Sequence, residues 1–90
     1  MFVQLNSTIS SYEKADSIKA FGLPVQGLID GSFYCSQDFK TKKQAITFMT
    51  KRAELLISDK KQLRKAINSI KKDNVFIFGD AILTMKKINS

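Results

Sequence analysis

The sequence has no histidine and no tryptophan, and it has a single cysteine and a single proline among 90 residues. Without histidine there is no imidazole base, which excludes Ser-His and Cys-His nucleophile pairs and the common zinc sites built from cysteine and histidine. The eight carboxylates are spread singly along the chain, so they suggest neither an acid–base pair nor a carboxylate metal site. We therefore expect a protein that is not an enzyme, with no catalytic residues and no bound metal.

Glycine is scarce as well, at four residues. Gly22, Gly27, Gly31 and Gly79 form neither a phosphate-binding Walker loop nor a dinucleotide-binding fingerprint. Gly22, Gly31 and Gly79 are explained by a turn or by the end of a helix. We expect no nucleotide cofactor, and the sequence indicates no other cofactor.

Cys35 has no partner for a disulfide within the chain, so packing must stabilise the fold. This favours a reducing compartment such as the cytoplasm. Residues 1–6 lack the basic region and the long apolar stretch of a secretory signal, and no run approaches the roughly 18 apolar residues that a membrane span needs. We expect a cytoplasmic protein of one domain, residues 1–90, with Cys35 as a small core residue.

Positive charge is plentiful and unevenly placed. The chain has a net charge of +7, of which residues 1–40 contribute −1 and residues 41–90 contribute +8. A basic half favours polyanionic partners such as nucleic acid, an acidic protein surface or anionic lipid. Simple solubility in a lysine-rich organism explains the same composition, and the charge alone does not separate these readings.

Hydrophobic periodicity predicts the order β-α-β-β-α-α-β-β. Five short segments have the alternation or the apolar content of strands: 2–8, 25–29, 32–36, 75–78 and 81–85. Three segments have helical spacing and begin with a capping box: about 10–21, 41–57 and 59–73. This order favours an α+β fold, a small antiparallel sheet with the helices packed on one side.

Residues typical of turns lie between these strands and at the ends of these helices. Asp30-Gly31 and Gly79-Asp80 are predicted to close two tight hairpins, because such turns need residues with positive φ. Gly22 and Asn74 are predicted to end two helices in the left-handed conformation. Gly27, inside the strand predicted over 25–29, indicates that this strand is irregular.

The helix predicted over 59–73 has the most regular helical spacing in the chain. Its apolar face consists of Leu63, Ala66, Ile67 and Ile70. A basic stripe lies opposite, formed by Lys61, Arg64, Lys65, Asn68 and Lys72 and widened by Lys60 and Lys71. Cations at this spacing can contact successive phosphates of a nucleic acid. The side chains of Arg64 and Asn68 can form hydrogen bonds with base edges. We predict that this face binds nucleic acid or a nucleoprotein complex, with an acidic protein surface or a merely solvated face as alternatives.

Residues 41–88 place two helices directly before a β-hairpin. This order of elements resembles that of winged-helix DNA-binding domains. The resemblance implies that the 59–73 helix enters a groove of the nucleic acid, while Lys86 and Lys87 on the last strand contact its backbone. It offers an alternative architecture for the C-terminal half.

The hairpin predicted over 75–85 is apolar on both faces. If Phe78 pairs with Ala81, one face contains Phe76, Phe78, Ala81, Leu83 and Met85, and the other contains Val75, Ile77, Ile82 and Thr84. Such strands are either central in a sheet or covered on both sides. The second face is therefore a predicted protein interface, with a partner or with a second copy of the chain.

A small size, a lack of catalytic chemistry and a two-faced hairpin also suit an inhibitor or adaptor that acts by protein–protein binding. In these respects the chain is similar in style to small proteins of phages and mobile elements, including anti-CRISPR-like inhibitors. Aromatic residues offer a further mode, because rings on strands can stack nucleobases. The candidates are Phe33, Tyr34, Phe76 and Phe78, for which packing in the core is the alternative.

Overall fold

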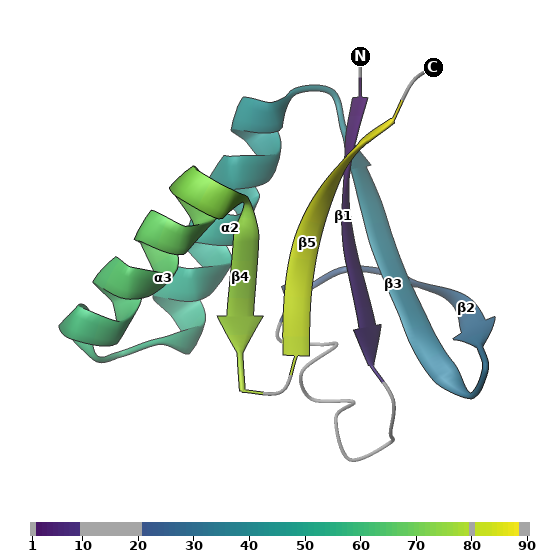
Figure 1. The fold of residues 1–90 in the computed structure, drawn as a ribbon, viewed down its shortest axis with the longest axis horizontal. Coiled ribbons are helices and arrows are strands. Elements are labelled where there is room, and N and C mark those ends of the chain that lie inside the picture. Colours follow the sequence, from purple (N-terminus) through teal and green to yellow (C-terminus); the bar gives the residue numbers. More distant parts are fainter. Residues whose placement is uncertain (1, 10–20, 80, 89–90) are drawn as a thin grey trace.

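The computed structural model describes residues 2–9, 21–79 and 81–88. Its elements are β1 (Phe2–Ile9), β2 (Val25–Ile29), β3 (Ser32–Phe39), α2 (Lys42–Leu56), α3 (Lys60–Asp73), β4 (Val75–Phe78) and β5 (Ala81–Ile88). The strands form one antiparallel sheet in the order β2-β3-β1-β5-β4 (Figure 1). The predicted α+β fold is confirmed, while the helix predicted over about 10–21 falls almost entirely outside the described residues.

Both hairpins form where the turn residues predict them. Asp30 and Gly31 have φ values of 50° and 79°, and Gly79 has a φ of 61°, which is the left-handed region that these short loops require. Phe78 pairs with Ala81, so the register of the second hairpin is the expected one. Strand β2 is irregular near Gly27, as its glycine predicts, because the register shifts between residues 25 and 27.

Local hydrogen bonds set the ends of the two helices. The Oγ1 atom of Thr41 accepts a bond from the backbone N of Gln44 at 3.1 Å, which starts α2. The carboxylate of Asp59 starts α3 by accepting from the backbone N of Lys61 at 2.8 Å. Helix α3 ends at Asn74, whose φ of 58° is the left-handed conformation that the sequence predicts there.

The helices cover one face of the sheet. Helix α2 contacts β1 and β3, and α3 contacts β4 and α2; Figure 1 shows the two helices side by side and running in opposite directions. The core between these layers contains the following buried apolar residues: Val3, Leu5, Phe21, Leu23, Cys35, Ala45, Met49, Ala53, Ile70, Phe76, Ala81 and Leu83. The predicted packing of the helices on one side of the sheet is therefore what the structure has.

The opposite face of the sheet, which we call the open face, has no helix over it in the described part of the chain. Side chains alternate between the two faces along a strand. The register therefore places the following residues there: Gln4, Asn6, Thr8, Tyr34, Ser36, Asp38, Val75, Ile77, Ile82, Thr84 and Lys86. The open face is polar over β1 and β3 and apolar toward β4.

The winged-helix alternative is wrong. The two helices run side by side in opposite directions (Figure 1), whereas the helices of a helix-turn-helix pair cross at about 90–120°. The hairpin is also part of the five-stranded sheet, because β5 pairs with β1 as well as with β4. The physical reason is its inner face, because Phe76 and Leu83 are fully buried in the core that β1 shares. Strand β4 lies at the edge of the sheet, which also corrects the expectation that both strands are central or doubly covered.

Candidate nucleic-acid interface

Helix α3 is held by a narrow apolar edge. Ile70 is fully buried, and Leu63 and Ala66 are partly buried against the core. Ile67, which the spacing predicts on the inward face, is only partly buried and lies at the border of that edge. The rest of the helix surface faces outward, so packing against the core does not restrict the side chains there.

All seven predicted residues of α3 are exposed. Together they form what we call the α3 basic face: Lys60, Lys61, Arg64, Lys65, Asn68, Lys71 and Lys72. At 1.5 Å per residue, the face extends over about 18 Å of helix. Six of its seven side chains are positively charged. Each strand of duplex DNA has about one phosphate per 3.4 Å of the helix axis, so a face of this length can lie beside about five phosphates of one strand.

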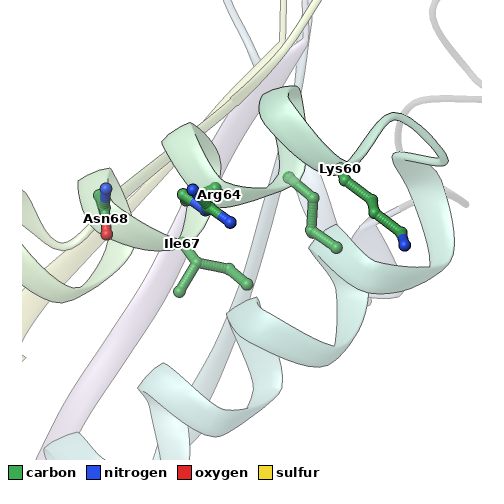
Figure 2. A pocket seen from close by; sticks show the side chains of 5 residues that line it. Lys60, Arg64, Ile67 and Asn68 are labelled. Atoms are coloured by element: carbon green, nitrogen blue, oxygen red, sulfur yellow. The ribbon is translucent and has the colours of Figure 1, made fainter.

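A surface hollow of about 310 Å³ lies on this helix, lined by Lys60, Leu63, Arg64, Ile67 and Asn68. Figure 2 shows Lys60, Arg64 and Asn68 projecting from successive turns of α3, with Ile67 between the last two. The hollow therefore combines cationic and amide groups with an apolar floor. Arg64 and Asn68 lie one turn apart, so the two side chains can contact one ligand.

The positions of the charges along α3 differ in their effect on the helix. Lys71 and Lys72 lie in the last turn, where the helix dipole favours cations. Lys60 and Lys61 lie in the first turn, which contains no acidic residue, and the dipole disfavours cations there by about 0.3–1 kcal/mol each. Helix stability therefore explains the lysines at the end of α3 and not those at its start.

Lys86 and Lys87 do not join the α3 basic face as one group. Both are exposed near the end of β5, where Lys86 pairs with Gln4 and Lys87 with Val3. Neighbouring residues of a strand point to opposite faces. Lys86 therefore belongs to the open face and Lys87 to the face that the helices cover, and a flat ligand cannot contact both.

The residues predicted as a protein interface are brought together. Val75 pairs with Thr84 and Ile77 pairs with Ile82, so the four lie side by side on the open face. Ile77 is 59% exposed and Ile82 is 48% exposed. They form the apolar end of the open face, beside the edge strand β4.

Other residues from the sequence analysis lie in the core or are partly buried. Cys35 is buried in the core as expected, and this burial raises the pKa of its thiol. Phe76 is also in the core, whereas Phe33, Tyr34 and Phe78 are partly buried. Among the residues that the structure describes, no three His, Cys, Asp or Glu side chains gather in a way that could hold a metal ion.

A polar cluster on the open face was not predicted. It contains Gln4, Asn6, Tyr34 and Asp38, which hydrogen bonds connect across β1 and β3. The alternation in β1 indicates that Gln4 and Asn6 share a face, but the sequence does not show which strand lies beside β1. Only the strand order brings Tyr34 and Asp38 to them.

Comparison of this chain with protein-family models, with curated proteins and with solved structures finds no match. Within the described ranges, neither helix combines the length and the apolar character that crossing a bilayer requires.

Proposed function

We propose that this chain is a non-catalytic binding module that contacts nucleic acid, or a nucleoprotein complex, through the α3 basic face. One observation carries the proposal: α3 buries only a narrow apolar edge and exposes all seven residues of that face. A ligand with regularly spaced negative charges suits a row of cations of this length. An acidic protein surface is the alternative partner for the same face.

The expected binding has two components. Lysines of the α3 basic face neutralise phosphates and release counterions, which gives an affinity that falls steeply with salt and does not depend on sequence. Arg64 and Asn68, at the hollow, add the side-chain types that form paired hydrogen bonds with guanine and adenine edges. The first component supplies most of the affinity, and the second supplies any base preference.

The test is a salt series with short single- and double-stranded DNA and RNA, for the wild type and for Lys61→Glu/Lys65→Glu. The matched control is Lys43→Glu/Lys51→Glu on α2, which changes the net charge equally at two exposed positions. We expect the α3 variant to lose most of its affinity at about 50 mM salt and its log–log salt slope to fall by about two. The control variant should retain most of the affinity and most of the salt slope.

Two outcomes contradict the proposal. If no binding is detected at low salt, the chain is not a nucleic-acid-binding module. If both double variants weaken binding equally, the attraction depends on net charge and not on α3. Far-UV circular dichroism of each variant verifies that the helices are intact, which is expected because the four lysines are exposed.

The exposed pair Ile77 and Ile82 favours a second candidate, protein–protein binding by the hairpin, as in an inhibitor or adaptor of the phage or mobile-element type or in a homodimer. Apolar residues paired across an edge hairpin are a common feature of interaction surfaces. Ile77→Lys/Ile82→Lys should abolish capture of a protein partner in nuclease-treated lysate, or convert a dimer to a monomer in light scattering. A monomeric mass at high concentration, with no nuclease-resistant partner, contradicts this candidate.

A further inference from the structure

Hydrogen bonds fix a group of polar side chains on the open face. The hydroxyl of Tyr34 lies 3.2 Å from Oε1 of Gln4 and is also hydrogen-bonded to Oδ1 of Asn6. The Nε2 atom of Gln4 donates to Oδ1 of Asp38 at 3.0 Å. Each member of this chain orients the next, so the group is arranged before any ligand arrives.

These bonds also determine how the tyrosine ring lies. Tyr34 pairs with Thr8 across the two strands, yet its hydroxyl reaches Asn6 and Gln4, two and four residues further along β1. A side chain that stood perpendicular to the sheet, as most do, would not reach them. The side chain therefore leans along the sheet toward Gln4, and it is only partly buried.

A hollow of about 490 Å³ lies beside this ring, and its lining includes Gln4, Gln26, Tyr34, Ser36 and Asp38. The β-bulge in β2 brings Gln26 there. Residues 25 and 27 pair with neighbouring residues of β3, so Gln26 is the extra residue, and its Nε2 donates to the backbone O of Ser36 at 3.1 Å. Bulges often redirect a side chain next to a binding site.

The chemistry of the lining selects among ligands. Amides supply donors and acceptors, the Asp38 carboxylate supplies an acceptor, and Tyr34 supplies an aromatic surface. No lysine or arginine lines this hollow in the described chain, so an anion has no counterion there. A flat, uncharged heterocycle with donors and acceptors on its edge satisfies all of these groups, and a nucleobase is such a ligand.

Lys86 lies close enough to the Asp38 carboxylate for one nucleotide to contact both, with its base at Asp38 and its phosphate at Lys86. Gln4 pairs with Asp38 on one side and with Lys86 on the other. Lys86 is therefore two strands from the carboxylate, roughly 10 Å at the usual strand spacing. The same row of the open face thus offers an acceptor for a base edge and a cation for a phosphate.

We propose that this hollow binds an unpaired base of a single-stranded nucleic acid. The base stacks on the outer side of Tyr34, Gln4 and Asp38 contact its edge, and Lys86 contacts a phosphate. The inference rests on the proposed function and adds a preference for single strands. Because α3 packs on the other side of the sheet, the two surfaces act separately: the α3 basic face binds any polyanion, and the hollow recognises unpaired bases.

The fluorescence of Tyr34 provides a direct measure of binding at the hollow. The chain has two tyrosines and no tryptophan, so Tyr12→Phe leaves Tyr34 as the source of tyrosine fluorescence. This variant is titrated with single-stranded oligothymidylate and with an abasic strand of the same length, which has the phosphates but no bases. We expect the base-containing strand to quench the fluorescence and to bind about tenfold more tightly, the gain expected from a stacked base.

Two further variants locate the effect. Tyr34→Leu removes the ring and should abolish the tenfold preference, whereas Tyr34→Phe keeps the ring and should retain most of it. Lys61→Glu/Lys65→Glu should lower the affinity for both strands, but oligothymidylate should still quench the fluorescence of Tyr34. The comparison of the two strands in Tyr34-containing protein does not depend on any Tyr34 substitution, so it remains decisive if Tyr34→Leu unfolds.

The outcomes separate this inference from the proposed function. Equal, salt-dependent binding of both strands with unchanged fluorescence overturns the hollow as a base site and leaves the α3 proposal standing. Retention of the preference in folded Tyr34→Leu also overturns it. A lack of binding to either strand overturns both proposals.

Discussion

The two described helices have almost the same length, 15 residues in α2 and 14 in α3, but they are used differently. Helix α2 lies on β1 and β3 in the middle of the sheet and buries Ala45, Met49 and Ala53 completely. Helix α3 lies at the edge, on β4 and α2, and Ile70 is its one fully buried residue. Helix α2 therefore contributes three fully buried residues to the core, and α3 contributes one.

This difference indicates where to look for function. On α2, the inward side chains are closely packed in the core, so a substitution there lowers the stability of the whole fold. On α3, most positions face solvent, and neither the core nor the helix dipole explains the lysines of its first turn. Residues that packing does not explain are the better candidates for binding. The comparison therefore predicts that stability depends mainly on α2 and binding mainly on α3.

The largest expected effect tests the α2 side of this comparison. Met49→Ala removes a fully buried side chain and should lower the free energy of unfolding by about 2–5 kcal/mol, because the neighbours cannot fill the space. Ile67→Ala on α3 is the control, since its side chain is only partly buried, and should cost roughly 1 kcal/mol or less. Urea unfolding followed by circular dichroism measures both. Equal losses would remove the distinction between the helices.

Much of the fold could be predicted because its signals are local. The caps at Thr41, Asp59 and Asn74 set the helix ends, and a two-residue turn determines that Phe78 pairs with Ala81. Exposure of the α3 basic face follows from helical spacing alone. Two strands are nevertheless three residues longer than predicted: β3 extends to Phe39 and β5 to Ile88, because pairing with β1 keeps polar residues in the sheet.

Features that depend on the lateral order of strands could not be predicted. The sequence does not show that β1 lies between β3 and β5, and this pairing is what joins the hairpin to the larger sheet and leaves β4 at an edge. The polar cluster was missed for the same reason, since Gln4 meets Asp38 only when β1 pairs with β3. Long-range pairing has no local signature in the sequence.

A smaller effect tests how α3 is attached. Asn74 ends the helix with a φ of 58°, and its Nδ2 donates to the backbone O of Ile70 at 3.0 Å. Asn74→Ala should cost about 1 kcal/mol or more, because alanine tolerates the left-handed conformation poorly. Helix α2 ends at Ile57 with an extended φ of −115°, so its end has no such requirement.

The control for this change is Asn74→Gly, which loses the side-chain bond but keeps the conformational freedom. It should be clearly less destabilising than Asn74→Ala in urea unfolding. Hydrogen exchange adds a local readout, since the amides in the last turn of α3 should exchange faster in the alanine variant while those of α2 keep their protection. Faster exchange in both helices would mean that α3 is as integral to the core as α2.

The smallest expected effect concerns the core beneath the helices. Burial raises the pKa of the Cys35 thiol above its ordinary value of 9.0, so the folded state favours the neutral thiol. The resulting stabilisation is complete at lower pH and is lost as the pH rises above 9.0, where the thiol of the unfolded chain ionises first. The free energy of unfolding should therefore fall with rising pH more steeply in the wild type than in Cys35→Ala. All other ionisable groups are the same in both proteins, so their contributions cancel in this difference.

Cys35 also sharpens the comparison of the helices, because it lies on β3, which α2 contacts. A thiol reagent should label it at the rate at which that core layer opens, and Met49→Ala should speed the labelling. Asn74→Ala should speed it less, in proportion to its smaller cost in stability, because loosening the end of α3 does not by itself uncover β3. If Asn74→Ala exposes the thiol as readily as Met49→Ala does, the two helices open together, and the assignment of stability to one and binding to the other no longer holds.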